Sequence, residues 1–217
     1  MTPVSTQGIV LKYWKYKEND CVVQIFTRAL GKQSYLIHAP QSKRSKFRAA
    51  YRLPLSCLVL EVTHSPKREW GSITDARADQ WHLSLSTDPV KASLSFFIAD
   101  LIAATQLQGE CDEALFDYLL ETIDRLDQAE QGLADFHLRF LLDYTRLLGF
   151  DPRATFESDY GRSIPAGQRR LLMQGMAGQE LSRTDRRDWM DLYLAYLRHE
   201  LPFMGPLSSL DVLNGLL

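Results

Sequence analysis

Residues 7–38 read QGIVLKYWKYKENDCVVQIFTRALGKQSYLIH and decide the fold of the first part of the chain. Residues 7–13, 21–28 and 32–38 are rich in Val, Ile, Leu, Tyr and Thr, a composition typical of β-strands. Turn-forming stretches separate them: Lys17-Glu18-Asn19-Asp20 and Ala29-Leu30-Gly31. The stretch therefore predicts three consecutive strands.

Further along the chain, residues 53–64 and 70–79 predict two more strands, and no long helix interrupts the series. Five strands within about 80 residues fit a small antiparallel barrel such as an OB-fold. A β-sandwich is the less suitable alternative because it normally needs about seven strands.

The apolar period becomes helical at Asp88, which precedes Pro89 in a pair typical of a helix N-terminus. Apolar side chains then recur every three or four residues in three stretches. The second stretch opens at Cys111 or Asp112, and the third stops at Gly149, before Pro152. The predicted inner positions are Val90, Leu94, Phe97, Ile98, Leu101 and Ile102; Phe116, Leu119, Leu120, Ile123 and Leu126; and Leu133, Phe136, Phe140, Leu141, Tyr144, Leu147 and Leu148.

The remaining residues predict a loop at 159–163, a short helix at 168–176, a long helix capped by Thr184 and a terminal helix after Ser208 or Ser209. The fold class is α+β. An N-terminal five-stranded OB-fold barrel at residues 1–80 precedes an all-α helical domain at residues 81–217, which we expect to dock partners.

Positive charge is concentrated at the start of the chain. Residues 1–70 contain 12 Lys or Arg and 4 Asp or Glu, a balance of +8, whereas residues 71–217 contain 13 and 23, a balance of −10. Opposite signs in the two parts favour different partners, with the first part suited to a polyanion.

Composition bounds the class of protein. Hydrophobic residues make up 45% and charged residues 24% of the chain, which is ordinary for a globular protein. No signal peptide and no apolar run of about 18 residues is present, so we expect a cytoplasmic protein. Cys21, Cys57 and Cys111 are too widely spaced for a disulfide framework or a cysteine zinc site and predict buried free thiols.

Several stretches, in the same order along nearly the whole chain, resemble the RecO family of recombination mediators. The most specific of them leads from Gly132 through Phe140-Leu141 to Leu147-Leu148-Gly149-Phe150-Asp151-Pro152. The others are Gly8-Ile9-Val10-Leu11 with Tyr16-Lys17-Glu18-Asn19-Asp20, Gln24-Ile25-Phe26-Thr27-Arg28, Gly31-Lys32-Gln33-Ser34-Tyr35, the basic link Ser42-Lys43-Arg44-Ser45-Lys46, Tyr196-Leu197-Arg198-His199-Glu200 and Ser208-Ser209-Leu210-Asp211-Val212-Leu213.

The resemblance implies a non-enzymatic DNA repair protein without a cofactor. It would bind single- and double-stranded DNA, anneal complementary strands and, with RecR, help to load recombinase on DNA coated by single-strand-binding protein. Many RecO proteins bind zinc through four cysteines after the Leu-Gly-Phe segment. Residues 153–170 contain no Cys or His here, so we predict a short form of the family without a metal.

Nucleic-acid binding is also predicted from the residues themselves. A barrel binds single strands when Lys and Arg follow the phosphates and aromatic rings stack on bases. Residues 12–17 interleave both types, and Tyr13, Lys15 and Lys17 would share one side of the strand, with Trp14 and Tyr16 opposite. A second basic cluster follows in the link, and Lys67 and Arg68 lie in the next turn. The predicted DNA-binding residues are Lys12, Trp14, Lys15, Tyr16, Lys17, Arg28, Lys32, Lys43, Arg44, Lys46, Arg48 and Arg52.

Partner binding is predicted for the helical domain. RecO-like proteins hold there the acidic, apolar C-terminal tail of single-strand-binding protein, which requires an apolar notch beside a cation. Arg139 and Arg146 are the candidates for that cation. The aromatic stripe of Trp189, Tyr193 and Tyr196 is interpreted as core.

Catalysis has little support. No Walker loop, H-E-x-x-H or G-x-S-x-G motif is present. His137 is interpreted as a core or boundary residue, and Asp185, Asp188 and Asp191, interleaved with arginines, as a self-paired helix face. Two alternatives stay open: an adaptor whose basic barrel binds an acidic protein without binding DNA, and a metal-dependent nuclease.

Overall fold

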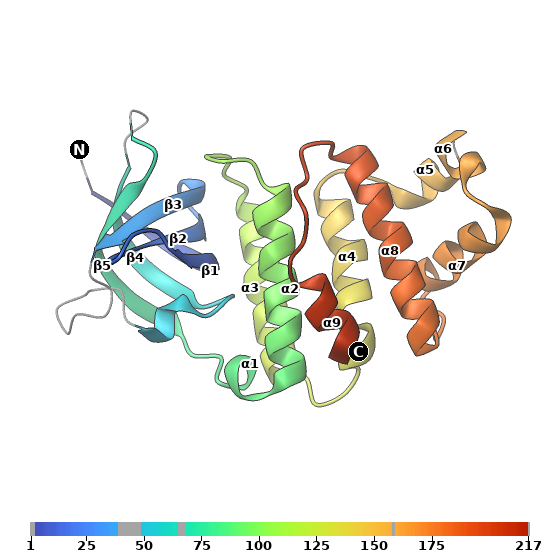
Figure 1. Cartoon of the computed structure of the whole chain (residues 1–217), viewed down its shortest axis with the longest axis horizontal. Coiled ribbons are helices and arrows are strands. Elements are labelled where there is room, and N and C mark those ends of the chain that lie inside the picture. Colours follow the sequence, from blue (N-terminus) through green and yellow to red (C-terminus); the bar gives the residue numbers. More distant parts are fainter. Residues whose placement is uncertain (1–2, 39–48, 65–67, 158, 217) are drawn as a thin grey trace.

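The computed structural model describes residues 3–38, 49–64, 68–157 and 159–216. In this part of the chain a β-barrel precedes a helical region (Figure 1). The barrel is closed in the order β1-β2-β3-β5-β4, and β3 pairs with β5 in parallel while the other pairs are antiparallel. This confirms the OB-fold barrel. The strands are β1 (Val4–Lys15), β2 (Asp20–Thr27), β3 (Gly31–His38), β4 (Cys57–Thr63) and β5 (Gly71–Gln80).

The barrel interior follows the alternation expected of strands. In β3, Gln33, Tyr35 and Ile37 are buried, whereas Lys32 and Ser34 are half-buried. One side of the sheet therefore points into the barrel. The buried cluster that fills it consists of Val10, Val23, Ile25, Tyr35, Ile37, Tyr51, Leu58, Leu60 and Val62.

The fourth strand starts later than the sequence predicts. Residues 53–56 precede β4, and a short 3-10 helix, η1 (Ala49–Arg52), brings Tyr51 into the barrel interior. Leu55 has a φ of 62°, a left-handed conformation that is rare for a leucine. The prediction was wrong there because the apolar run Leu53-Pro54-Leu55 does not reveal a turn, in which Leu55 is buried while Leu53 is exposed.

The helical region contains more helices than the sequence predicts. Its helices are α1 (Ser84–Thr87), α2 (Pro89–Thr105), α3 (Glu113–Gln128), η2 (Leu133–Asp135), α4 (Phe136–Leu147), α5 (Pro152–Glu157), α6 (Asp159–Ser163), α7 (Ala166–Met176), α8 (Arg183–Glu200) and α9 (Leu210–Leu216).

The predicted helix ends are mostly confirmed by hydrogen bonds. Asp88 Oδ1 accepts from the Val90 N–H at 2.8 Å, and Asp112 Oδ1 accepts from the Leu115 N–H at 2.9 Å, so both cap a helix. Gly149 has a φ of 85°, the left-handed geometry that ends a helix.

Two local predictions were wrong. Residues 159–163 form α6 instead of a loop. Pro152 does not continue α4, as predicted, but it also begins α5. Proline is acceptable in a first helical turn because no N–H is needed there. The cap of α8 is Ser182, whose Oγ accepts from the Asp185 N–H at 3.1 Å, and Thr184 lies inside the helix.

The barrel and the helices share a hydrophobic core. Ile9, Leu11 and Phe26 of the barrel belong to the same buried cluster as residues of α2, α3, α4 and α8. The Phe26 and Phe116 rings stack with centroids 5.9 Å apart. Figure 1 shows α2 and α3 between the barrel and the later helices, so the two halves are joined over a packed interface. Trp189, Tyr193 and Tyr196 are fully buried, as predicted.

Candidate nucleic-acid surface and partner groove

Three of the predicted DNA-binding cations point at the helical region. Lys12 Nζ lies 2.7 Å from Asp100 Oδ1 of α2, and Arg28 Nη2 lies 2.6 Å from Asp117 Oδ1 of α3. Lys32 Nζ donates to the Ala103 carbonyl oxygen at 2.7 Å. The opposite charges of the two halves are therefore partly used to join barrel and helices, and these cations are engaged within the chain.

A second group of residues, four of them predicted to bind DNA, lies on the barrel away from that interface. We call it the outer barrel face and define it as Trp14, Lys15, Tyr16, Lys17, Arg68 and Trp70. Trp14 is 40% exposed and Tyr16 is 44% exposed, which confirms that aromatic rings at the end of the first strand reach the surface. The Tyr16 and Trp70 rings meet edge to face with centroids 4.4 Å apart. This contact joins the β1–β2 turn to the start of β5.

Two basic members of the outer barrel face, Lys17 and Arg68, lie beside this aromatic pair. Lys17 Nζ lies 5.2 Å from the centre of the Tyr16 ring, a cation–π distance. Lys15 and Arg68 are exposed, and Arg68 and Trp70 line a hollow of about 310 Å³ together with His38. The sequence analysis placed Arg68 in a basic turn after the link but did not single out Trp70. The sequence signal that could have identified Trp70 was its position two residues after the basic Arg68.

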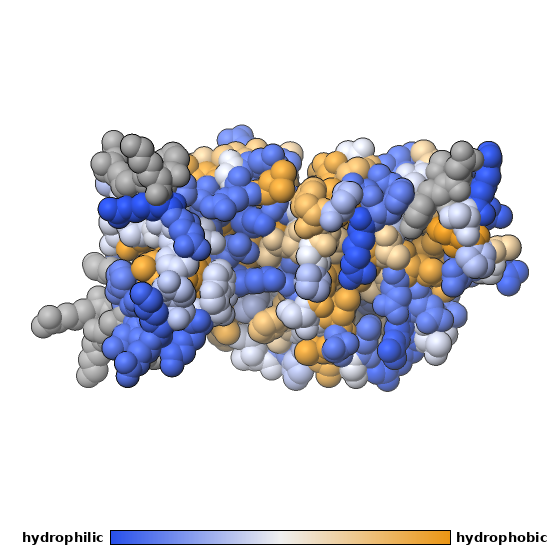
Figure 2. All heavy atoms as spheres, turned by 45° about the horizontal axis from the view of Figure 1, so that its top comes forward, coloured by the Kyte–Doolittle hydropathy of each residue, from blue (hydrophilic) through white to orange (hydrophobic). Residues whose placement is uncertain are grey.

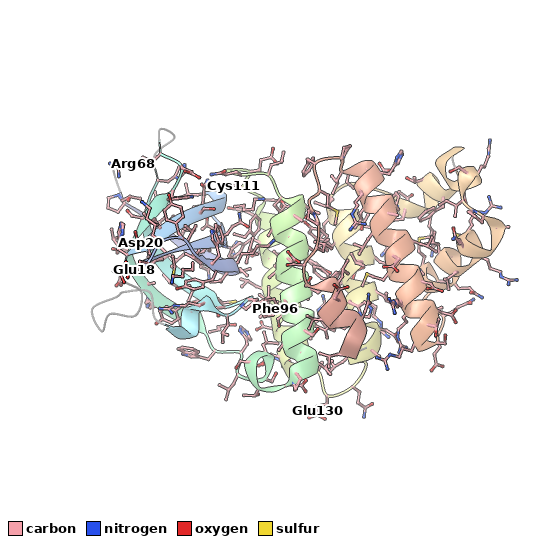
Figure 3. All side chains as sticks on the ribbon, in the orientation of Figure 1. Glu18, Asp20, Arg68, Phe96, Cys111 and Glu130 are labelled. Carbon is pink, nitrogen blue, oxygen red and sulfur yellow. The ribbon has the colours of Figure 1, made fainter. Side chains whose placement is uncertain are left out.

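The outer barrel face also carries acidic side chains. Glu18 and Glu69 are exposed, and Asp20 Oδ1 lies 2.9 Å from His38 Nδ1. Figure 3 shows Glu18, Asp20 and Arg68 on the barrel side turned away from the helices. Hydrophilic side chains cover much of the barrel in Figure 2. Among the described residues, this side of the barrel therefore combines aromatic rings and cations with exposed carboxylates.

The predicted alternation along residues 13–17 holds only to the end of the strand. Beyond Lys15, the Tyr16 and Lys17 N–H groups both donate to the Asp20 carbonyl oxygen, so the chain turns. Tyr13 is half-buried, and the Arg52 guanidinium lies 5.1 Å from its ring centre. Burial raises the pKa of Tyr13 to about 12. Arg52 therefore sits over an aromatic ring beside the barrel interior.

The basic link lies outside the described residues. Lys43, Arg44, Lys46 and Arg48 belong to it, as does Lys67 of a later turn. The described residue before the link is His38, which lines the hollow with Arg68 and Trp70.

Both predicted partner-binding cations line one groove. Arg139 and Arg146 of α4 lie on the rim of a groove of about 550 Å³ that faces the end of α7, and the acidic Asp135, Asp143 and Glu180 also line it. Leu138, Leu142 and Met176 supply its apolar surface. Arg146 Nη1 lies 3.2 Å from Asp143 Oδ1, whereas Arg139 forms no ion pair with any described residue. We call this the α4–α7 groove.

Possible catalytic groups are not assembled in the described part of the chain. It holds no cluster of three or more His, Cys, Asp or Glu side chains suited to a metal. Asp185 caps the start of α8 together with Ser182, and Arg186 pairs with Asp135 of η2 at 3.5 Å, so these two contacts do not form the predicted self-paired helix face. His137 is 4% exposed, and its burial, together with Arg186, lowers its pKa to about 4. Cys21 and Cys57 are buried as predicted, but Cys111 is exposed.

Comparison with known proteins accounts for both halves. Residues 1–80 match the family described as Recombination protein O N terminal, and residues 86–199 match Recombination protein O C terminal. The chain belongs to the RecO family. It is 29% identical to the DNA repair protein RecO of Porphyromonas gingivalis over 98% of both chains. It is 29% identical to that of Bacteroides fragilis, over 97% of this chain and 98% of the relative. The RecO protein of Flavobacterium psychrophilum is 32% identical over 69% of this chain and 63% of its own.

These RecO matches confirm the family resemblance seen in the sequence. They span nearly the whole chain, and the boundary between the two family matches falls just after β5. Within the described residues, no helix has both the length and the hydropathy needed to cross a bilayer. The chain is thus a DNA repair protein of the RecO type with the expected barrel and helices.

Proposed function

We propose that this RecO-family chain binds single- and double-stranded DNA on the outer barrel face and anneals complementary strands. The observation that carries the proposal is the Tyr16–Trp70 aromatic pair with Lys17 and Arg68 beside it and the exposed Lys15 next to Tyr16 in the sequence. Exposed rings stack on bases of any sequence, and neighbouring cations follow the phosphates. No base-reading motif accompanies them, so binding would tolerate any sequence.

Annealing would follow from charge neutralisation. Two strands repel each other through their phosphates, and cations that hold both strands on one surface reduce that repulsion until complementary bases pair. No covalent step is needed, so we infer that the chain is not an enzyme and uses neither ATP nor a metal. We place this activity in the cytoplasm, where the bacterial chromosome lies.

Salt dependence separates two versions of this proposal. If Lys15, Lys17 and Arg68 alone contact phosphates, affinity for single strands should fall about 20-fold between 50 and 200 mM salt, from a slope of about −0.7 for each contact. If Lys43, Arg44, Lys46 and Arg48 also contribute, seven contacts predict a fall of about 900-fold. Fluorescence anisotropy with a mixed-sequence oligonucleotide measures the slope.

The α4–α7 groove is proposed to hold the acidic C-terminal tail of single-strand-binding protein. Its apolar surface from Leu138, Leu142 and Met176 suits an apolar terminal side chain, and Arg139 on the rim suits a carboxylate. Contact with RecR is proposed through the barrel. Together these contacts would bring the chain to coated DNA and help to load recombinase there.

The decisive experiment is annealing of complementary oligonucleotides coated with single-strand-binding protein. The parent chain should accelerate annealing, and a variant with Lys15, Lys17 and Arg68 changed to Ala should lose most of that acceleration. Arg77→Ala is a matched control because Arg77 is an exposed barrel cation outside the face. Full binding and annealing by the triple variant would move the DNA contact away from this face, whereas a parent chain that binds no DNA would favour the adaptor whose barrel binds an acidic protein.

A further inference from the structure

A basic cavity of about 240 Å³ lies where α8 begins, between α4 and α9. It is separate from the outer barrel face and from the lining of the α4–α7 groove. None of the described residues that line it is acidic. They are His137, Arg183, Thr184, Arg186, Arg187, Leu213 and Asn214.

The N-terminus of α8 gives this cavity a positive potential. The helix spans Arg183–Glu200, and its first N–H groups have no partner within the helix. Ser182 satisfies the Asp185 N–H, while Thr184 of the first turn lines the cavity. Aligned peptide dipoles and unpaired N–H groups together make such a helix end attractive to anions.

His137 provides an independent indication of a ligand. Its side chain is almost completely buried and lines the cavity, yet its Nδ1 has no hydrogen-bond partner among the described residues. A buried polar atom without a partner is destabilising, and native structures normally avoid it. Burial and the nearby Arg186 hold the pKa of His137 well below neutrality, so the imidazole is neutral and carries one N–H to donate.

The three arginines of the cavity differ in how far their side chains already bind other groups of the chain. Arg186 Nη1 donates to the Leu181 carbonyl oxygen at 3.0 Å and faces Asp135. Arg183 Nη2 donates to the Gly215 carbonyl oxygen at 3.1 Å. Arg187 is exposed and forms no ion pair with a described residue. No acidic side chain among the described lining residues balances the positive charge of the cavity. Hydrogen bonds to backbone carbonyl oxygens hold Arg183 and Arg186 in place.

We propose that this cavity binds a phosphate group. Its donors come from three elements: the α4 imidazole, the first turn of α8 with Arg183 and Arg187, and the Asn214 amide of α9. Donors on several sides suit a tetrahedral oxyanion better than a planar carboxylate, and arginine is well matched to phosphate oxygens. The phosphate would come either from a free phosphate compound or from the 5′ end of a DNA strand.

Calorimetric titration of the full chain with inorganic phosphate, at constant ionic strength in chloride, tests the proposal. Saturable binding is expected, and Arg187→Ala should weaken it about tenfold or more because a charge-assisted hydrogen bond is lost. Arg198→Ala, an exposed arginine near the other end of α8, is the matched control and should bind like the parent. NMR resonances of the His137 ring should move as phosphate is added.

A second arm identifies the source of the phosphate. A 5′-phosphorylated trinucleotide that binds more tightly than its 5′-hydroxyl form, with the difference lost in Arg187→Ala, would assign the cavity to strand ends. Equal binding of both forms, with inorganic phosphate still bound, would assign it to free phosphate. Asn214→Ala gives an independent variant. The proposal is overturned if Arg187→Ala and Arg198→Ala bind alike, if the His137 resonances stay fixed, or if acetate moves them equally.

Discussion

Lys12 Nζ of β1 lies 2.7 Å from Asp100 Oδ1 of α2, so a single ion pair joins the barrel to the central helix. The other oxygen, Asp100 Oδ2, accepts from the N–H and the hydroxyl of Ser209, both at 3.0 Å, just before α9. Burial raises the pKa of Asp100, but the Lys12 ammonium and the Ser209 hydrogen bonds outweigh burial and lower it below its usual value. One carboxylate therefore connects three elements that are distant in sequence.

The Lys12→Met variant should lose stability and keep its affinity for DNA. Removing the ammonium leaves the Asp100 carboxylate buried without its charge partner, at a cost of about 1–3 kcal/mol. Urea denaturation measures the loss. Lys15→Met is the control, because Lys15 is exposed and should change the free energy of unfolding little while weakening DNA binding. The reverse pattern would assign Lys12 to the DNA surface and Lys15 to the fold.

Acid should destabilise the chain through His137. The pKa of this residue is lowered to about 4 in the folded chain, while the unfolded chain takes up the proton near 6.5. Stability from the neutral imidazole is therefore present at pH 7 and decreases as pH falls from 6.5 to 4, by about 3 kcal/mol in total. Asp100 acts in a lower window, because its stabilisation is lost only as pH falls through a pKa below 3.8.

Denaturation series at pH 7, 5.5 and 4 in buffers without phosphate measure how the free energy of unfolding changes with pH. His137→Leu should be nearly flat over that range relative to the parent, whereas His199→Leu, at an exposed histidine of α8, should retain the parental slope. Equal slopes in all three proteins would mean that burial of His137 is not what links stability to pH.

The fold was largely predictable because its signals are local. Alternating apolar residues revealed the strands, and Asp88, Asp112 and Gly149 marked helix ends through capping chemistry that depends on near neighbours. The turn at Leu55 escaped prediction because its left-handed backbone is stabilised by burial against the helices. The residues next to Leu55 in the sequence do not reveal that this side chain packs against helices far along the chain.

The site was less predictable, since the direction of a side chain depends on tertiary packing. Lys12 and Lys15 are neighbours of the same type on β1, yet one pairs with Asp100 and the other is exposed on the outer barrel face. A count of charged residues cannot distinguish these two lysines. Likewise, the Tyr16–Trp70 contact joins positions far apart in sequence and follows only from closure of the barrel. Arg139 and Arg146 were found together because helical spacing already places them on one face of α4.

The outer barrel face should lose affinity for single strands when its rings are removed. Trp14→Ala and Tyr16→Ala should each weaken binding by about 1–3 kcal/mol, the usual contribution of one stacked base. Trp81→Ala is the control, because Trp81 is 65% exposed but lies beside Tyr51 and α1 rather than on this face. Anisotropy titrations at a fixed salt concentration compare them. If all three variants bind alike, stacking on this face does not contribute.

The α4–α7 groove should discriminate between charges at its rim. Arg139→Glu should weaken binding of a peptide with the tail sequence of single-strand-binding protein at least tenfold, because it replaces an attractive contact with a repulsive one. Arg146→Glu should have a smaller effect, since Arg146 already faces Asp143 at 3.2 Å. Arg187→Glu serves as the control: it removes a cation of the neighbouring phosphate cavity without touching the groove. Calorimetry with the peptide measures all three, and a stronger loss in Arg187→Glu than in Arg139→Glu would move the tail to the α8 cavity and contradict both assignments.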